Sequence, residues 1–194
     1  HMLTTQYRMH PTIREFPSAR FYENRLEDGC SSSDRPPVAG FLWPDWDKPV
    51  AFVPVHGAEI EEEVGSSRSN MDEAATVIQI VNDLLSPGDL SPEDIGVISP
   101  YAGQVRLIRT MIDGEIDGLE VKSVDGYQGR EKEIIVLSTV RANEAGKVGF
   151  LSNYRRLNVA LTRAKRGLIV VGDDRTLRND ATWASWLDWI SESN

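Results

Sequence analysis

The stretch Glu133-Ile134-Ile135-Val136-Leu137-Ser138-Thr139-Val140 decides the fold, because a short run of this apolar character is typical of a strand that is buried on both faces. Four other short runs are also rich in Val and Ile. They are Val50–Val55, Ile95–Ser99, Leu119–Val124 and Gly167–Val171. The sequence therefore predicts five strands that all lie in the interior of one sheet.

Amphipathic helical patterns alternate with these strands. The predicted helices are Asp72–Leu85, Gln104–Ile112, Tyr154–Ala164 and Ala181–Ile190. Asn70-Met71-Asp72-Glu73 resembles a capping box at the start of the first helix, and Leu85-Ser86-Pro87-Gly88 ends it. Strands that alternate with helices indicate an α/β fold, a parallel sheet with helices on both faces.

The remaining segments show no such periodicity. Residues Cys30–Lys48 are rich in Ser and Pro and predict an irregular excursion, and Glu59–Asn70 predicts a loop. Trp183 and Trp186 share one face of the last helix, so we expect them in the core rather than on a surface that stacks bases.

Length and composition are those of a globular protein with one core. The chain has 194 residues, is 40% hydrophobic and contains no apolar stretch of the roughly 20 residues that a bilayer requires. No secretory signal is evident, which favours a cytoplasmic or nuclear protein without membrane contact. One cysteine and three scattered histidines predict neither a disulfide nor a metal site. His1-Met2 resembles a cloning remnant, so we expect one domain over residues 3–194.

Charge is distributed unevenly along the chain, whose net charge is -9. Between Glu59 and Asp94 ten residues are acidic and one is basic, whereas between Arg141 and Arg178 nine are basic and three are acidic. The acidic run is typical of a solvated face. The basic run fits either a surface for nucleic acid or a salt-bridged helix, and charge alone does not separate the two.

Motifs for several enzyme classes are absent from the sequence. It contains no Gly-x-x-x-x-Gly-Lys-Ser/Thr, so it does not supply the backbone and lysine that hold a triphosphate. It also lacks the nucleophile elbow and metalloprotease signatures of hydrolases. Asp72-Glu73 follows polar residues rather than a strand, which indicates a helix start instead of a magnesium-binding box.

In open α/β sheets, ligands bind beyond the carboxyl ends of the strands. Three polar segments follow predicted strands, namely Ser99–Gln104, Asp125–Glu131 and Arg141–Asn143. The polar residues of these three segments are therefore candidates for function.

Arginines are the strongest candidates for chemistry. Arg8 lies in Gln6-Tyr7-Arg8-Met9-His10-Pro11, and Arg163 follows Arg156 by seven residues, near the same face of the predicted helix. A guanidinium that reaches a nucleotide held by another domain neutralises charge on the transferred phosphoryl group. The alternative for each is an ordinary surface arginine paired with a carboxylate.

Three long motifs resemble motifs IV, V and VI of superfamily 1B helicases. They are Gln6–Pro11, Ser123–Lys132 and Arg156–Lys165, and Ser99-Pro100-Tyr101 with Gln104 is similar to a further motif between IV and V. Within the superfamily the chain most resembles the nonsense-mediated-decay RNA helicases, the regulators of nonsense transcripts, over Leu3–Leu187. Asp125-Gly126-Tyr127 is instead similar to the senataxin-type members.

This resemblance implies the second of two RecA-like domains, a parallel sheet with helices on both faces. In the family, ATP and its magnesium ion are held mainly by the P-loop domain. The resemblance places Tyr7, Arg8, Glu131 and Arg163 at the nucleotide, with Arg8 and Arg163 as catalytic arginines. Glu131 has the alternative of pairing with Arg130 or Lys132.

The resemblance also implies a single strand of RNA or DNA that lies across both domains and is moved in the 5'-to-3' direction. Pro100, Tyr101, Ser123 and Arg141 are the predicted contacts, although a tyrosine at a strand end equally often packs inside the domain. The implied partners are the P-loop domain and RNA-decay or processing factors. The alternative function is a non-catalytic module that binds nucleic acid or protein.

Overall fold

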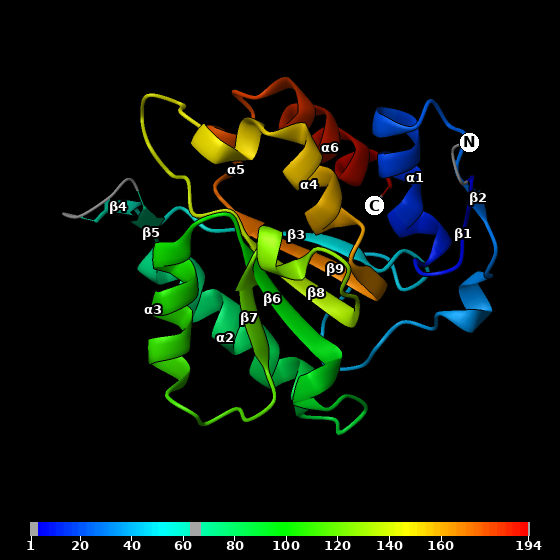
Figure 1. Cartoon of the computed structure of the whole chain (residues 1–194), viewed down its shortest axis with the longest axis horizontal. Helices are drawn as coiled ribbons and strands as arrows, with labels where there is room; N and C mark the ends of the chain where they lie inside the picture. The colour runs from blue at the N-terminus through cyan, green and yellow to red at the C-terminus, as the bar shows by residue number, and fades with distance from the viewer. Residues whose placement is uncertain (1–3, 63–66, 194) are drawn as a thin grey trace.

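A five-stranded parallel sheet forms the middle layer of the protein (Figure 1). The structure is a computed structural model that describes residues 4–62 and 67–193. In spatial order the strands are β3 (Val50–Pro54), β9 (Ala164–Gly172), β8 (Lys132–Ser138), β6 (Ile95–Ser99) and β7 (Glu120–Ser123). These are the five predicted strands, so the α/β, RecA-like fold class is confirmed. His1 and Met2, the predicted cloning remnant, lie outside the described residues.

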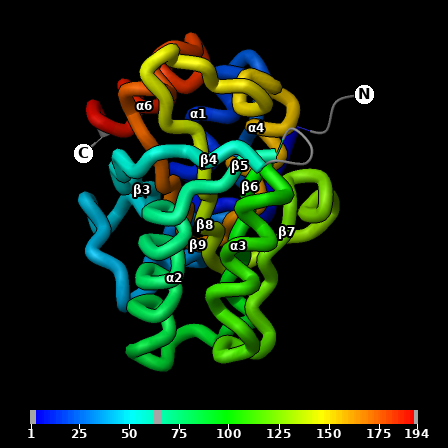
Figure 2. Tube along the Cα trace, turned by 90° about the vertical axis from the view of Figure 1, so that its left-hand side faces the viewer, coloured from blue at the N-terminus to red at the C-terminus, as the bar shows by residue number. Residues whose placement is uncertain are grey.

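Helices cover both faces of this sheet. On one face lie α2 (Met71–Leu85) and α3 (Ala102–Ile112), which run side by side in Figure 2. On the other face lie α1 (Pro11–Phe21), α4 (Tyr154–Leu161), α5 (Asp174–Leu177) and α6 (Ala181–Ser193). This arrangement buries both sides of every central strand, as the continuous apolar runs predicted.

The core is split into two halves by the sheet, because successive residues of a strand point to opposite faces. In β8, Ile134 and Val136 pack in the half under α2 and α3, whereas Ile135 and Leu137 pack in the half under α1, α4 and α6. Trp183 and Trp186 are buried in the second half, which confirms their prediction as core residues. The carboxyl end of β8 is thereby held between two packed layers.

The predicted capping box at the start of α2 is present only in part. The Asn70 side chain accepts a hydrogen bond from the Glu73 backbone N at 3.1 Å, as expected for an N-cap. The Glu73 carboxyl does not return to Asn70. It instead accepts from Ser138 Oγ at 2.7 Å and from Val140 N at 2.8 Å, and thus joins α2 to the end of β8.

This buried network fixes an unusual backbone at Val140. The residue has a φ of 73°, a left-handed conformation that is strongly unfavourable for a β-branched side chain. Glu73 holds the N–H of Val140, and Asn70 Nδ2 donates to its carbonyl at 3.2 Å. Gln104 of α3 completes the network through Ser138 Oγ at 3.0 Å. Side-chain hydrogen bonds therefore stabilise the turn that leads into Arg141.

Two predicted elements differ in their extent. The helix expected over Tyr154–Ala164 ends at Leu161, because Ala164 is already the first residue of β9. Arg163 thus lies in the turn beyond α4 and not on the helix face that carries Arg156. The predicted loop Glu59–Asn70 contains a short antiparallel pair, β4 (Ile60–Glu61) and β5 (Arg68–Ser69).

The amino-terminal segment shows no strong periodicity in the sequence, yet it is ordered by long-range contacts. A parallel pair, β1 (Thr5–Gln6) and β2 (Glu27–Asp28), precedes and follows α1. Pro17 lies inside α1, and such a residue weakens a helix prediction. His10 N donates to Lys165 O at 2.8 Å, which places residues 7–10 beside the start of β9.

None of the helices in the described part of the chain combines the length and apolar character needed to span a bilayer.

Glu73 predicts a pH dependence of stability. Burial raises its pKa from 4.5 to about 8, and its Oε1 has no partner among the described residues, which a neutral carboxyl tolerates better than a charged one. The folded protein therefore binds this proton more tightly than the unfolded chain does. The resulting contribution to the free energy of unfolding is complete below about pH 4.5 and is lost as the pH rises toward 8.

Glu73→Gln removes this titration while keeping an oxygen for Ser138 and Val140. We expect the free energy of unfolding of the variant, relative to wild type, to increase by a few kcal/mol between pH 5 and pH 8.5 in urea titrations, since each pKa unit corresponds to about 1.4 kcal/mol. If the free energy of unfolding changed with pH in the same way for both proteins, the raised pKa of Glu73 would be contradicted.

Candidate functional site

The predicted site residues form two groups at opposite ends of the same strands. Tyr7, Arg8, Glu131, Arg163 and Lys165 lie where β8 and β9 begin, and we call them the amino-edge cluster. Pro100, Tyr101, Ser123, Arg141 and Phe150 lie beyond the carboxyl ends of β6, β7 and β8, and we call them the carboxyl-edge surface. Glu131, the last residue of the polar segment Asp125–Glu131, therefore lies at the amino end of β8 and not at the carboxyl edge. After β7 the chain returns to the amino end of the sheet, and Glu131 immediately precedes the first residue of β8.

Arg8 and Glu131 are paired in the amino-edge cluster, although 123 residues separate them. Arg8 Nε lies 2.5 Å from Glu131 Oε2, and Arg8 Nη1 donates to the carbonyl of Thr162 at 3.0 Å. The hydrogen bond from Arg8 holds the pKa of Glu131 below its usual range. Both side chains remain partly exposed, so this ion pair orients Arg8 more than it stabilises the fold.

Arg163 differs from Arg8 in its partners. Its guanidinium donates to neutral oxygens, Val159 O at 3.0 Å and Thr162 Oγ1 at 3.1 Å, and it has no ion pair within residues 4–62 and 67–193. Burial and the charge of the neighbouring Arg8 lower its pKa. The alternative expected for this residue, a surface arginine paired with a carboxylate, is therefore not observed, and the cation is available to an anionic ligand.

Tyr7 presents its ring to solvent beside these arginines, with 69% of the residue exposed. A Cβ at Gly29 would overlap the Tyr7 ring, so the close approach requires a glycine there. Arg35 donates to the carbonyls of Tyr7 at 2.9 Å and of Arg8 at 2.8 Å. The backbone that carries Tyr7 and Arg8 is thus fixed while the ring stays exposed.

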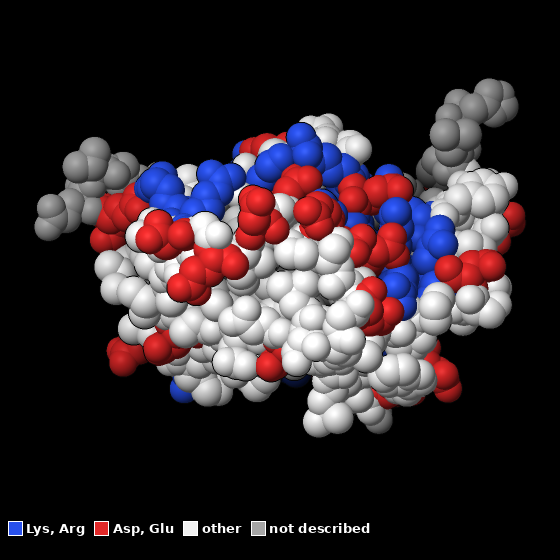
Figure 3. All heavy atoms as spheres, turned by 90° about the horizontal axis from the view of Figure 1, so that it is seen from below, with Lys and Arg blue, Asp and Glu red and all other residues white. Residues whose placement is uncertain are grey.

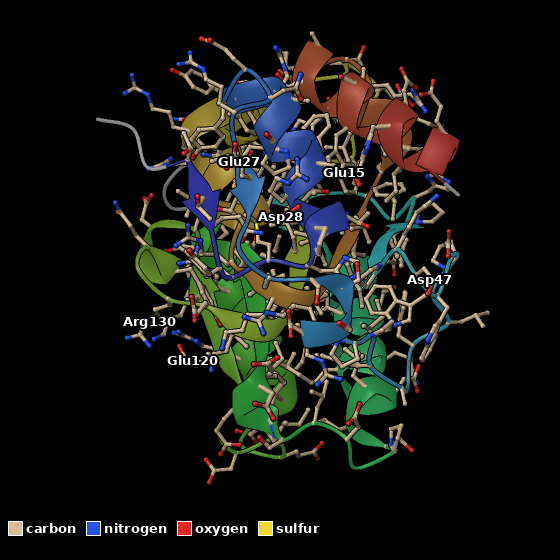
Figure 4. All side chains as sticks on the ribbon, turned by 90° about the vertical axis from the view of Figure 1, so that its right-hand side faces the viewer. Glu15, Glu27, Asp28, Asp47, Glu120 and Arg130 are labelled. Carbon is tan, nitrogen blue, oxygen red and sulfur yellow. The ribbon has the colours of Figure 1, made fainter. Side chains whose placement is uncertain are left out.

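The alternative partners proposed for Glu131 are occupied elsewhere. Arg130 Nη1 lies 3.0 Å from Glu120 Oε2, and Lys132 Nζ lies 3.1 Å from Glu120 Oε1. Figure 4 shows Glu120 and Arg130 next to each other on this side of the molecule. Glu131 instead contacts Lys165, whose Nζ lies at 3.5 Å. The sequence places Lys165 in the third motif but gave no sign of this contact.

Two predicted contacts of the carboxyl-edge surface are buried. Tyr101 is 2% exposed and Arg141 is 4% exposed. Arg141 Nε lies 2.9 Å from Glu59 Oε2, and its Nη1 donates to the Tyr101 hydroxyl at 3.2 Å. Hydrogen bonds from Arg141, Asn143 and Ala142 N outweigh the effect of burial and hold the pKa of Glu59 below its usual range. The ring of Tyr101 follows the packing alternative stated for a tyrosine at a strand end.

The outer layer of this surface is more accessible. Pro100 and Ser123 are half-buried, and Pro100 shares a shallow hollow with Val124 and Phe150. Ser123 lines a neighbouring pocket of about 320 Å³ together with Arg106, Arg109 and Lys122. Phe150 was not among the predicted contacts, because the sequence around an isolated aromatic residue in a loop does not indicate whether its ring is exposed.

A larger pocket of about 550 Å³ opens beyond the ends of β3 and β9. His56 Nδ1 lies 2.9 Å from Asp173 Oδ1, and with Asp174 the two residues are close enough to share a cation. Asp173 is already engaged by Arg175 at 2.9 Å and by Thr176 at 2.8 Å. We assign no ion to this pocket.

Charged side chains of both signs share one part of the surface. Figure 3 shows Lys and Arg gathered in a band with Asp and Glu among them, while much of the remaining face is uncharged. The basic excess expected from residues 141–178 is thus partly neutralised by ion pairs such as Arg156–Asp125 and Arg141–Glu59.

Known proteins resemble this chain over almost its whole length. A family described as "AAA domain" matches residues 1–175. A regulator of nonsense transcripts 1 homolog of Drosophila melanogaster is 42% identical over 98% of this chain and 17% of its own length. The ATP-dependent helicase NAM7 of Saccharomyces cerevisiae is 43% identical over 93% of this chain and 19% of its own length. The probable helicase MAGATAMA 3 of Arabidopsis thaliana is 41% identical over the whole chain and 25% of its own length.

These matches confirm the resemblance drawn from the three motifs. The chain spans between 17% and 25% of the length of these three relatives. It belongs to the AAA domain family, and its homologues include helicases that regulate nonsense transcripts.

Proposed function

We propose that this chain is the second motor domain of an ATP-dependent helicase and acts on ATP held by a P-loop domain of the same protein. The relatives named as helicases support this assignment, because the matched segment is a small part of each of them. The sequence itself lacks the motif that binds a triphosphate. A complete ATP site therefore requires residues from both domains.

The observation that carries the proposal is that Arg163, which lies beside the oriented Arg8, has no carboxylate partner in the part of the chain that the structure describes. In phosphoryl transfer, charge builds on oxygens of the transferred group, and arginines that approach from another domain stabilise it. Arg163 is free for this role without first breaking an ion pair. The Nη2 of Arg8 makes no hydrogen bond among the described residues. Arg8 can therefore bind a phosphate through Nη2 while Glu131 holds its Nε.

Tyr7 and Glu131 complete the nucleotide side of the proposal. The exposed ring of Tyr7, which lies against Gly29, can stack on the flat face of the nucleotide base. Glu131 serves as the anchor of Arg8 and has a second oxygen that faces Lys165. The magnesium ion that accompanies ATP would be bound by the P-loop domain.

A single strand of RNA or DNA is the proposed second ligand, in the cytoplasm or nucleus. We assign it to the carboxyl-edge surface, where Pro100 and Ser123 are partly accessible and the buried Tyr101 accepts a hydrogen bond from Arg141. This edge lies at the far end of the strands from the amino-edge cluster. Closure of the two domains on ATP would then move this surface along the strand in the 5'-to-3' direction.

The isolated 194-residue chain should not hydrolyse ATP, because it supplies only one side of the site. The measurement is steady-state phosphate release with and without saturating oligouridine. Hydrolysis stimulated by the oligonucleotide in this chain alone would overturn the two-domain assignment.

Arg163→Ala in the protein that carries both domains should lower kcat at least about a hundredfold and leave ATP affinity close to wild type, as for arginines that act in trans. Arg178→Ala is the matched control, because Arg178 is ion-paired with Asp188 at 2.7 Å away from the cluster. A kcat of Arg163→Ala equal to that of the control would exclude the catalytic role.

Arg8→Ala should impair both ATP binding and hydrolysis, since it removes a phosphate ligand and leaves Lys165, at 3.5 Å, as the remaining ion-pair partner of Glu131 among the described residues. We expect a weaker Kd for ATP in equilibrium binding and a lower kcat in the same preparation. Wild-type values for both quantities would refute the assignment of Arg8.

A further inference from the structure

The exposed aromatic ring of the carboxyl-edge surface belongs to Phe150 and not to Tyr101. Phe150 is 47% exposed, although the residue that follows it, Leu151, is buried in the core. The two rings touch, with centroids 5.5 Å apart and an angle of 40° between their planes. Tyr101 therefore supports one side of Phe150, while about half of the residue stays exposed.

The turn that carries Phe150 is built to hold this position. It is a 3-10 turn over Gly149–Ser152, in which Phe150 N donates to the Tyr101 hydroxyl at 3.3 Å. Gly149 has a φ of 56°, and a Cβ there would overlap Arg141 Nη1. The buried pair Arg141–Glu59 thus forms the floor of the turn, and the ring is exposed on a fixed backbone.

Phe150 lines two openings of the surface. One is the shallow hollow shared with Pro100 and Val124, and the other is an open pocket of about 230 Å³ that is also lined by Arg68, Tyr101 and Arg141. Phe150 is the residue common to both, so it connects the Pro100 side of this surface with the Arg68 side.

Charge at the rim favours a polyanion. Lys147 and Arg155 are exposed, and neither has an ion pair among the described residues. Arg156 lies over the Phe150 ring, with its guanidinium carbon 5.9 Å from the centroid. Arg156 is also paired with Asp125, and Arg155 donates to the Tyr154 hydroxyl, so neither side chain is free of contacts. An exposed aromatic ring with basic side chains nearby is the arrangement with which proteins bind single strands without reading their sequence.

We propose that Phe150 stacks a base of the bound single strand, with Lys147 and Arg155 on the phosphates beside it. This inference rests on the proposed function, because it names the stacking residue of the strand surface assigned above. It also gives Tyr101 a positioning role, through its hydroxyl bond to Phe150 N and its ring contact.

The test is Phe150→Leu in the protein that carries both domains, with binding of fluorescent oligouridine measured by anisotropy. Stacking of one base predicts a rise in Kd of between about fivefold and about a hundredfold. Phe150→Trp should restore the wild-type Kd, which separates stacking from a structural defect. Trp46→Leu, which changes another exposed aromatic on the irregular excursion, should bind as wild type does.

An oligonucleotide made of abasic sites provides the second arm. Wild type and Phe150→Leu should bind it equally, since no base remains to stack. Arg155→Ala should reduce the slope of log Kd against log salt by about 0.7, whereas Phe150→Leu should leave that slope unchanged.

Two results would overturn the proposal. They differ in whether they also exclude the strand-binding part of the proposed function. A Phe150→Leu protein that binds oligouridine as tightly as wild type excludes the stacking role alone, and the surface would then be open to a protein partner. A wild-type protein that binds no oligonucleotide excludes the stacking role together with the strand-binding part of the proposed function.

Discussion

The hydrogen bonds from the buried Glu73 carboxyl to the end of β8 are the interaction on which the rest of this structure depends. They join α2 to the central strand and hold Val140 in a backbone conformation that its side chain disfavours. That turn directs Arg141 inward to Glu59, and Arg141 supports the Tyr101 hydroxyl and the turn at Gly149. A buried carboxyl in the core is therefore linked, through Val140, Arg141 and Tyr101, to the turn that exposes Phe150 at the carboxyl edge.

The two candidate ligand surfaces differ in how they are assembled. The carboxyl-edge surface is formed by turns that follow strands directly, so its residues are near one another in the fold by topology alone. The amino-edge cluster requires the segment before α1, the segment before β8 and the turn after α4 to meet. In the amino-edge cluster a partly buried cation, Arg163, is left without a carboxylate partner among the described residues.

The sheet was predictable from the sequence, because five apolar runs are long enough to reveal strands buried on both faces. The segment around α1 was not, since Pro17 interrupts its helical pattern and tertiary contacts such as His10 N to Lys165 O order it instead. The motifs identified Arg8, Glu131 and Arg163. The ion pair between Arg8 and Glu131 depends on where the chain returns after β7, and the spacing of the motifs in the sequence does not predict that path. Burial of Tyr101 and exposure of Phe150 depend on the pair Arg141–Glu59, which joins residues 82 positions apart.

The strands β8 and β9 begin at the amino-edge cluster and end at the carboxyl-edge turns, so each crosses the domain without a break. Seven residues of extended chain span about 20 Å at roughly 3.3 Å per residue. Packed on both faces, such a sheet resists bending because close-packed interiors have low compressibility. If ATP moved the Arg8 end of the sheet, as the proposed function requires, a sheet of this stiffness would carry the displacement to the Phe150 end.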